Sequence, residues 1–238
     1  MKIALIGYGK MGKTIEQIAK ERGHEIVCII DAENLHDFES VAFAKADVAI
    51  EFTAPTVAID NYRRSWKVGV PVVSGTTGWK EQLPKIQEEI NANGFTLFWT
   101  SNFSLGVNIF FELNRHLATI MNQFGDYDVS ITETHHIHKL DAPSGTAITL
   151  AETILEKLNR KNQWVLGESD ATNELTIKAI REDEVPGTHA VRYEGSVDTI
   201  TLTHEAKNRL GLALGAVVAA EFTVGKTGFL NMQDLLKF

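Results

Sequence analysis

Short apolar runs alternate with stretches of helical spacing along the first part of the chain. The runs predict strands and the stretches predict helices. The predicted strands cover residues 3–7, 25–30, 48–52, 70–74 and 96–100, and the predicted helices cover 11–22, 57–67 and 84–91. Apolar strands separated by helices indicate a parallel sheet covered on both faces. Ligands of such sheets bind at the carboxyl ends of the strands.

The pattern changes after residue 102. Helices are predicted over 106–121 and 146–161, an alternating strand over 127–133, and antiparallel strands over 176–181, 189–194 and 198–206. The last two strands would join in a hairpin at Glu194-Gly195-Ser196. We therefore expect a second, α+β domain over 103–209. No strand is predicted after the apolar helix 210–222, so we assign that helix and the tail to the first domain, 1–102 and 210–238.

Composition excludes several classes of protein. The net charge of −8 argues against a nucleic-acid partner, because phosphate binding favours a basic surface. No run of about 20 apolar residues predicts a membrane span. The chain enters a strand pattern at once, which leaves no room for a signal peptide. Cys28 is the only cysteine, so disulfides are excluded, and we expect a cytoplasmic protein.

The first predicted strand runs directly into G-Y-G-K-M-G, a G-x-G-x-x-G pattern that opens a helix. With Asp31 at the end of the second strand, this context predicts a dinucleotide site. Gly7 permits the tight turn, Gly9 lets the backbone approach a pyrophosphate, and Gly12 lets the helix pack on the sheet. The predicted cofactor residues of this segment are Gly7, Tyr8, Gly9, Lys10, Met11, Gly12 and Asp31. The alternative is a glycine-rich turn without a ligand.

The residues after the second strand bear on the coenzyme. Asp31 would accept hydrogen bonds from the adenosine ribose and repel a 2′-phosphate, and Ala32 offers no cation for that phosphate. NADH is therefore slightly favoured over NADPH, although Lys10 or Lys13 could supply positive charge instead.

Two further segments follow strands at the predicted cofactor edge. They are Gly75-Thr76-Thr77-Gly78 and Thr100-Ser101-Asn102-Phe103. Small and hydroxyl side chains there would let a nicotinamide ring and its ribose approach the backbone. The alternative is ordinary turn chemistry. Their shared position at strand ends favours cofactor binding by Gly75, Thr76, Thr77, Thr100, Ser101, Asn102 and Phe103.

The segment E-T-H-H-I-H-K-L-D-A-P-S-G-T-A over 133–147 combines proton-transfer groups with a helix start. Ser144 is a natural N-cap, which leaves the amides of Gly145 and Thr146 open to one carboxylate of a dicarboxylate substrate. His136 and Lys139 could bind the other carboxylate. His135 would then be free to protonate the substrate.

A metal site is the first alternative for this segment, since His135, His136 and His138 lie close together with Glu133 and Asp141 nearby. No cysteine is near and no helical i, i+4 histidine pair exists, so we expect no metal. A solvated loop is the second alternative, but it does not account for Lys139 and the helix start that follow.

The chain resembles the 4-hydroxy-tetrahydrodipicolinate reductase (dihydrodipicolinate reductase) family. The matching segments are I-G-Y-G-K-M-G over 6–12, S-G-T-T-G-W over 74–79, S-N-F-S-L-G-V-N over 101–108, the histidine segment over 133–147, P-G-T-H over 186–189 and T-H-E-A-K-N-R over 203–209. The resemblance implies a Rossmann-type parallel-sheet domain and a smaller α+β domain with a mixed open sheet. It also implies a homotetramer assembled through the second domain, and closure of the domains around ligands.

The activity implied is the NAD(P)H-dependent reduction of the dehydrated form of 4-hydroxy-tetrahydrodipicolinate in lysine and diaminopimelate biosynthesis. The motif places His135 and Lys139 on catalytic positions, and His136, Gly145 and Thr146 on substrate-binding positions. Two departures are Ala32, where many members carry a basic residue, and an acidic segment over 180–184, where relatives often have a glycine-rich turn. Alternatives are another two-domain dehydrogenase of amino-acid metabolism and a non-catalytic dinucleotide sensor.

Overall fold

The computed structural model describes residues 1–208 and 210–237. Arg209, the last residue of the T-H-E-A-K-N-R motif, and Phe238 lie outside the described residues. The chain divides into two compact units, Met1–Leu105 with Leu210–Phe238 and Gly106–Arg209. Phe103, which the sequence pattern placed at the start of the second domain, packs in the first unit on Phe98 and Phe52, with ring centroids 5.9 and 5.6 Å away.

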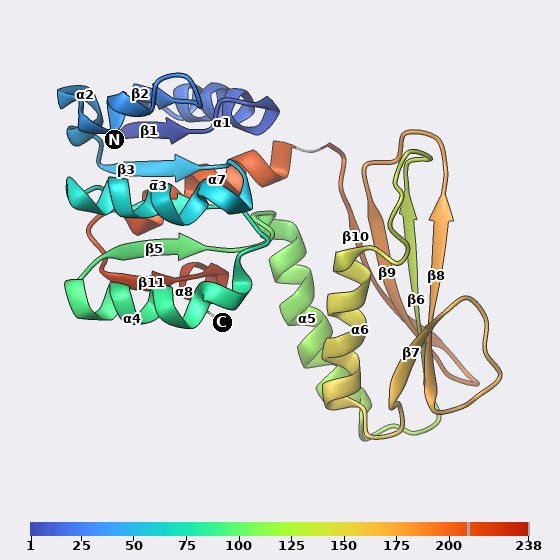
Figure 1. Cartoon of the computed structure of the whole chain (residues 1–238). Coiled ribbons are helices and arrows are strands. Elements are labelled where there is room, and N and C mark those ends of the chain that lie inside the picture. Colours follow the sequence, from blue (N-terminus) through green and yellow to red (C-terminus); the bar gives the residue numbers. More distant parts are fainter. Residues whose placement is uncertain (209, 238) are drawn as a thin grey trace. The chain divides into compact units, whose positions relative to one another are not determined.

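The first unit contains a six-stranded sheet with the order β11-β5-β4-β3-β1-β2 (Figure 1). Every pairing in it is parallel, which confirms the predicted parallel sheet. The strands are β1 Lys2–Ile6, β2 Glu25–Ile30, β3 Val48–Glu51, β4 Val72–Ser74, β5 Thr96–Trp99 and β11 Gly228–Leu230. Its central strands are apolar and buried, because helices cover both of their faces.

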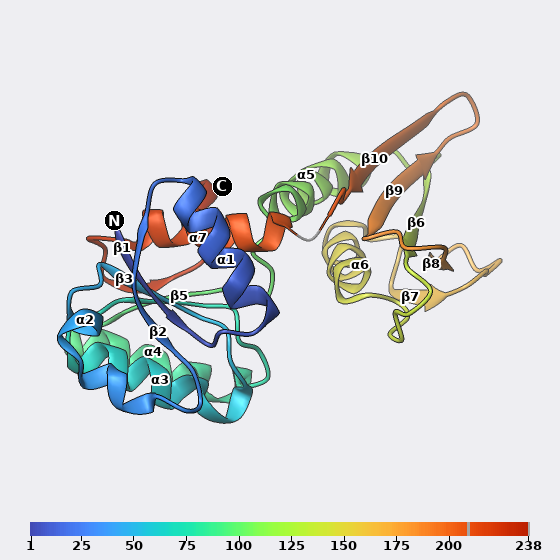
Figure 2. The ribbon, with the colours of Figure 1, turned by 90° about the horizontal axis from the view of Figure 1, so that it is seen from above.

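Helices α1 (Lys10–Glu21) and α7 (Leu210–Thr223) lie on one face of this sheet, and α3 (Pro55–Lys67) and α4 (Leu83–Asn93) on the other (Figure 2). The shorter elements of this unit are η1 Leu35–Glu39, α2 Val41–Ala44, η2 Lys80–Gln82 and α8 Met232–Leu236. None of the described helices is long and apolar enough to cross a membrane.

Strand β11 corrects one expectation from the sequence. Helix α7 was expected to have no strand after it, but β11 follows and pairs in parallel with β5 at the edge of the sheet. Gly228 aligns with Thr96 and Leu230 with Phe98. The strand has only 3 residues, too few to show an alternating or apolar pattern.

The second unit contains a five-stranded sheet with the order β10-β9-β6-β8-β7. Its strands are β6 Asp128–His135, β7 Gln163–Leu166, β8 Glu174–Arg181, β9 Thr188–Glu194 and β10 Thr199–Glu205. Helices α5 (Leu105–Met121) and α6 (Gly145–Lys157) lie side by side on one face of it (Figures 1 and 2). Buried side chains of both helices and of β6, β8 and β9 form the core of this unit.

The sheet of the second unit is mixed, as the family resemblance implied, but the strand pattern alone gave a different prediction. Strands β9 and β10 are antiparallel and joined by the expected hairpin, whose Gly195 amide donates to the Asp198 carbonyl at 2.9 Å. Strand β8 is instead parallel to β6 and β7, so its predicted antiparallel direction is wrong. The reason is β7, a strand between α6 and β8 that the sequence pattern did not predict, and beside which β8 runs in parallel.

Register in this sheet brings together residues far apart in the sequence. Glu133 of β6 aligns with His189 of β9, and His135 of β6 aligns with Arg181 of β8. Glu133 and His135 are two residues apart on one strand and therefore point to the same face of the sheet. Four polar side chains thus meet at one end of β6.

Candidate active site

The glycine turn after β1 has the geometry expected of a phosphate-binding turn. Gly7 has φ of +89°, and a Cβ added there would lie 2.1 Å from the Phe52 carbonyl oxygen, so only glycine fits. Gly9 is the N-cap of α1, and no side chain caps that end. The first-turn amides of α1 are therefore open to an anion.

Two hollows lie at the carboxyl ends of the strands of the first unit. One, of about 300 Å³, is bordered by Gly7, Asp31 and Ala32 together with Leu35 and Val57. The other, of about 360 Å³, is bordered by residues of the glycine turn and of the β4 loop: Gly9, Lys10, Met11, Gly12, Gly75, Thr76 and Thr77. Nine of these residues are predicted cofactor residues. They come from three separate segments of the sequence, and the structure brings them to one edge of the sheet, where ligands of parallel sheets bind.

Asp31 lies exposed just after β2, and its loop holds it in place. Its Oδ1 accepts the Ala32 amide at 2.8 Å, and its own amide donates to Asn34 Oδ1 at 2.7 Å. A carboxylate at this edge can accept ribose hydroxyls. Tyr8 points along α1, where its hydroxyl contacts Glu16.

The segment after β5, Thr100–Phe103, ends in a residue whose side chain is buried. Thr100 Oγ1 accepts the Asn102 amide at 3.2 Å, and Ser101 is exposed. Phe103 is only 2% exposed and belongs to the core of the first unit. Any contact of Phe103 with a cofactor therefore involves its main chain.

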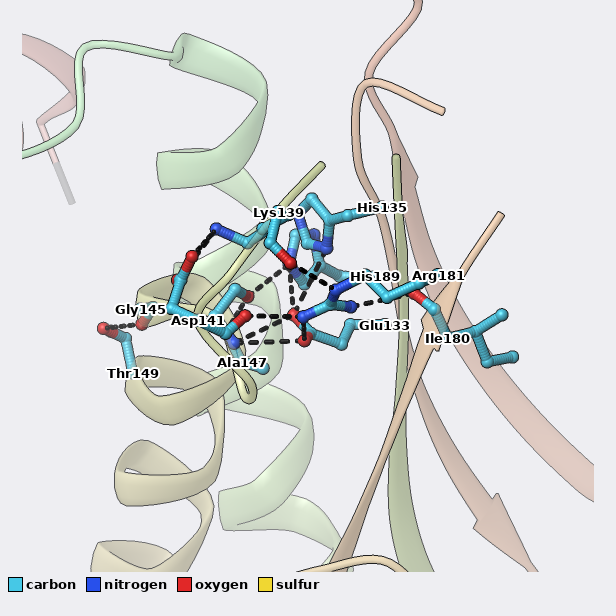
Figure 3. A network of polar contacts seen from close by, with 11 residues as sticks. Glu133, His135, Lys139, Asp141, Gly145, Ala147, Thr149, Ile180, Arg181 and His189 are labelled. Carbon is cyan, nitrogen blue, oxygen red and sulfur yellow. Dashed lines mark hydrogen bonds and ion pairs between the residues drawn. The ribbon is translucent and has the colours of Figure 1, made fainter. Parts of the chain in front are cut away.

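In the second unit, the carboxylate of Glu133 is the centre of a buried polar cluster (Figure 3). Both its oxygens accept the Ser144 amide at 3.1 Å, and Oε1 accepts from Arg181 Nη2 at 3.2 Å. Oε2 lies 3.4 Å from His135 Nδ1 and 3.6 Å from His189 Nε2. The sequence reasoning placed only His135 and Ser144 of this cluster in the site.

Burial and neighbouring charges set the protonation of this cluster. Burial alone would raise the pKa of Glu133, but hydrogen bonds from His189 and Ser144 and the charge of His135 outweigh it and lower that pKa to about 2. Burial also lowers the pKa of His135 to about 4, opposed by Glu133 and assisted by His189, Lys139 and Arg181. The unliganded site therefore holds a carboxylate and a neutral imidazole at neutral pH.

Lys139 lies on the loop beyond β6, with its ammonium against Asp141 (Figure 3). Its Nζ is 2.7 and 2.8 Å from the two Asp141 carboxylate oxygens. Arg181 fastens the same loop, because it donates to the main-chain carbonyls of Asp141 at 2.6 Å and Lys139 at 3.3 Å. His138 is exposed, and its Nε2 lies 3.1 Å from Glu184 Oε1.

Helix α6 begins as the sequence predicted. Ser144 is its N-cap, and the Ser144 Oγ accepts the Ala147 amide at 3.2 Å and lies 3.1 Å from His189 Nε2. The amides of Gly145 and Thr146 lie in the first turn, where no intrahelical acceptor exists. His136 follows the buried His135 and is half-buried. The helix start and the imidazoles therefore belong to one site.

Sequence reasoning missed Arg181 and His189, and considered Glu133 only as a metal ligand. The signal for Glu133 was present, since it shares the strand and the face of His135. Arg181 and His189 reach the cluster only through the register of β8 and β9. No spacing in the sequence encodes that register.

Glu133, His135 and His189 also lie close enough together to hold a metal ion. Their carboxylate is already the acceptor for Ser144 and the partner of the Arg181 cation. A cation at this point would have to displace those donors against the charge of Arg181. The groups around Glu133 therefore suit a carboxylate held by hydrogen-bond donors better than they suit a metal ion.

Comparisons with known proteins agree with this geometry. The family model for the N-terminus of dihydrodipicolinate reductase matches residues 1–103, and the model for its C-terminus matches residues 106–236. The 4-hydroxy-tetrahydrodipicolinate reductase of Christiangramia forsetii is 51% identical over 240 residues, covering 99% of this chain and 98% of the relative. The enzyme of that name from Methanoculleus marisnigri is 36% identical over 253 residues, covering 99% of each.

A solved structure has the same fold along almost the whole chain. It is the dipicolinate-bound dihydrodipicolinate reductase of Paenisporosarcina sp. TG-14, with a TM-score of 0.82 and 22% identity over 98% of both chains. Both family models and the sequence relatives thus agree from end to end, and the chain belongs to the 4-hydroxy-tetrahydrodipicolinate reductase (dihydrodipicolinate reductase) family of lysine biosynthesis.

Proposed function

We propose that the chain reduces the dehydrated form of 4-hydroxy-tetrahydrodipicolinate with NAD(P)H, with His135 and Lys139 as its catalytic residues. The observation that carries this proposal is the cluster at the end of β6. There His135 lies 3.4 Å from the buried carboxylate of Glu133, which accepts the amide of Ser144, the N-cap of α6. A protein that only senses dinucleotide has no use for an acid beside an anion site.

The first unit would bind the cofactor. The amides at the start of α1 suit the pyrophosphate, and Asp31 suits the adenosine ribose. The loops after β4 and β5 lie at the same edge of the sheet, where the nicotinamide end belongs. The exposed Asp31 and Ala32 leave no basic partner next to β2 for a 2′-phosphate, which slightly favours NADH over NADPH.

The second unit would bind the dicarboxylate. The Gly145 and Thr146 amides, with Ser144 at the cap, suit one carboxylate. His136 and Lys139 suit the other. In the free protein the ammonium of Lys139 is 2.7 Å from the Asp141 carboxylate. A substrate carboxylate would therefore replace Asp141 as the partner of Lys139.

Substrate binding would also prepare His135 to act as an acid. Burial, assisted by the charges of His189, Lys139 and Arg181, holds the pKa of His135 at about 4 in the free protein. Two substrate carboxylates offset those positive charges and raise the pKa toward neutrality. When bound, NAD(P)H would provide the hydride for the conjugated ring, and His135 would supply the proton that completes the reduction. Lys139, which the family resemblance places on a proton-donor position, would pair with a substrate carboxylate and support that transfer.

The direct test is the absorbance of NADH after addition of the condensation product of pyruvate and aspartate semialdehyde. We expect oxidation that depends on this product and is inhibited by pyridine-2,6-dicarboxylate, a planar dicarboxylate analogue. Binding of NADH without product-dependent oxidation would favour the sensor and reject the reductase. Oxidation with aspartate but not with the condensation product would favour another dehydrogenase of amino-acid metabolism.

The second unit would also mediate self-association into a homotetramer. Within the part of the chain that the structure describes, helices lie on one face of its sheet only. Its β9–β10 hairpin exposes the apolar side chains of Val197 (88% exposed) and Ile200 (40% exposed). Apolar side chains on an uncovered sheet favour association with another copy. Sedimentation equilibrium at micromolar concentration should give four times the chain mass, and a monomer would reject this assembly.

A further inference from the structure

Glu51, at the end of β3, is a fully buried carboxylate that none of the roles above uses. Hydroxyl groups surround it. Ser74 Oγ donates to its Oε2 at 2.5 Å, Thr76 Oγ1 donates to its Oε1 at 3.0 Å, and Thr53 Oγ1 donates to Oε1 as well. These donors come from the ends of two adjacent strands, so the carboxylate joins the β3 loop to the β4 loop.

Each of these hydroxyls is already an acceptor for another group. Thr76 Oγ1 accepts the Thr53 amide at 2.9 Å, and Thr53 Oγ1 accepts from Asn61 Nδ2 at 3.3 Å. Ser74 Oγ accepts the Thr76 amide at 3.2 Å and lies 2.7 Å from the Tyr62 hydroxyl. A hydroxyl group has one proton to donate, and each of these three hydroxyls donates it to Glu51.

The rest of Thr76 is held just as firmly. Its main-chain carbonyl accepts the indole N–H of Trp79 at 2.7 Å and that of Trp99 at 2.9 Å. Beside it, Gly75 lies against Phe52, so that an added Cβ would be 2.2 Å from the Phe52 ring. The loop after β4 thus has its amide, carbonyl and side chain fixed at Thr76, while the neighbouring Thr77 stays exposed at the hollow.

We propose that Glu51 is a positioning residue for cofactor binding, which fixes the Gly75–Thr77 loop in the conformation that receives the dinucleotide. The proposal rests on the proposed function, in which the hollow bordered by Thr53, Gly75, Thr76 and Thr77 binds that cofactor. Glu51 acts through the loop and touches no ligand itself. Its side chain must accept from all three hydroxyls at once, which an amide of the same shape cannot do.

The test is Glu51→Gln, which replaces one acceptor oxygen with an N–H donor. We measure the Kd of NADH by fluorescence, the Kd of pyridine-2,6-dicarboxylate by calorimetry, and the thermal midpoint. Loss of one hydrogen bond to a buried carboxyl group corresponds to a roughly tenfold rise in the NADH Kd. The Kd of the dicarboxylate, which binds the second unit, should stay within about twofold of the wild-type value.

Thr96→Val is the matched control, because Thr96 is a buried threonine at the opposite end of the same sheet. Its Oγ1 donates to the Lys226 carbonyl at 2.7 Å, away from the cofactor edge. This control should lower the thermal midpoint and leave the NADH Kd unchanged. An equal rise in the NADH Kd for Thr96→Val and Glu51→Gln would show a general loss of stability and overturn the proposal.

Thr76→Val gives the answer if Glu51→Gln does not fold, because it removes one donor and leaves Glu51 in place. We expect the same selective loss of NADH affinity. An NADH Kd within about twofold of the wild-type value, for whichever variant folds, overturns the proposal. A wild-type chain that binds no NADH would instead overturn the proposed function together with this one.

Discussion

The guanidinium of Arg181 donates to the buried carboxylate of Glu133 at 3.2 Å, across 48 residues of sequence. The same Nη2 atom donates to the Asp141 carbonyl at 2.6 Å. One side chain therefore joins the carboxylate beside His135 to the loop that carries Lys139. The planar fork of arginine suits this task, since an ammonium would offer a single point of attachment.

Arg181→Lys should separate positioning from charge. The substitution keeps the positive charge near Glu133 but loses the fork that holds the loop. We expect kcat/KM to fall by roughly tenfold to a hundredfold, through kcat and the KM of the dicarboxylate substrate, with the Kd of NADH unchanged. Steady-state kinetics and NADH fluorescence measure both quantities.

Arg192→Lys is the control for Arg181→Lys, because Arg192 lies on β9 of the same sheet and pairs at the surface with Glu194 at 2.9 Å. Its kinetics should match the wild type. Unchanged kinetics in Arg181→Lys would mean that the charge alone suffices and that the loop needs no clamp.

Stability should fall in acid because of His135. Its pKa is lowered from 6.5 to about 4 by burial, so the folded chain resists a proton that the unfolded chain accepts. The stabilising effect of the neutral imidazole is complete above pH 6.5 and is lost as pH falls toward 4, with a slope of at most about 1.4 kcal/mol per pH unit. Glu133, whose pKa falls from 4.5 to about 2, adds a further loss below pH 4.5.

Urea unfolding between pH 7 and pH 4 measures this slope. We expect His135→Gln to flatten it, whereas His138→Gln should leave it unchanged, because His138 is exposed beside Glu184. Equal slopes in His135→Gln and the wild type would show that other groups cause the acid sensitivity.

Asp141→Asn should strengthen dicarboxylate binding. Asp141 holds the Lys139 ammonium at 2.7 Å and is itself exposed, so it competes with an incoming carboxylate. Exposed pairs are weak, and we expect the Kd of pyridine-2,6-dicarboxylate to fall by roughly threefold. Calorimetry measures it, with Asp198→Asn as a control of the same charge change at the β9–β10 hairpin. Weaker binding in Asp141→Asn would show that Asp141 instead orients Lys139.

Coenzyme choice should depend on the residues just after β2. We expect kcat/KM to be modestly higher with NADH than with NADPH, and Ala32→Arg to move the ratio toward NADPH by roughly tenfold. Kinetics with both coenzymes decide this. A wild-type ratio clearly favouring NADPH would contradict the interpretation of Asp31, and would point to Lys10 or Lys13 as the phosphate partner.

The sequence predicted the first unit well because its signals are local. Apolar strands, the glycine turn and Asp31 follow one another within a single strand–helix–strand segment, and the parallel sheet is confirmed. Strand β11 was missed because a three-residue edge strand carries no pattern of its own. The family resemblance covered what periodicity could not, including the mixed sheet of the second unit.

The candidate site of the second unit was predicted only in part, because it depends on register. The motif identified His135, Lys139 and the start of α6, which are contiguous in the sequence. Arg181 and His189 lie on β8 and β9, and pairing with β6 alone brings them to Glu133. A shift of either strand by one residue would turn its side chain to the opposite face.

The most direct test of the account is kcat of His135→Gln, measured with NADH and the condensation product of pyruvate and aspartate semialdehyde. Loss of a proton donor lowers a rate by about 10² to 10⁴, and we expect a fall in that range with little change in the Kd of NADH or of pyridine-2,6-dicarboxylate. His138→Gln should keep the wild-type kcat. An unchanged kcat in His135→Gln would remove His135 from the mechanism and contradict the central claim.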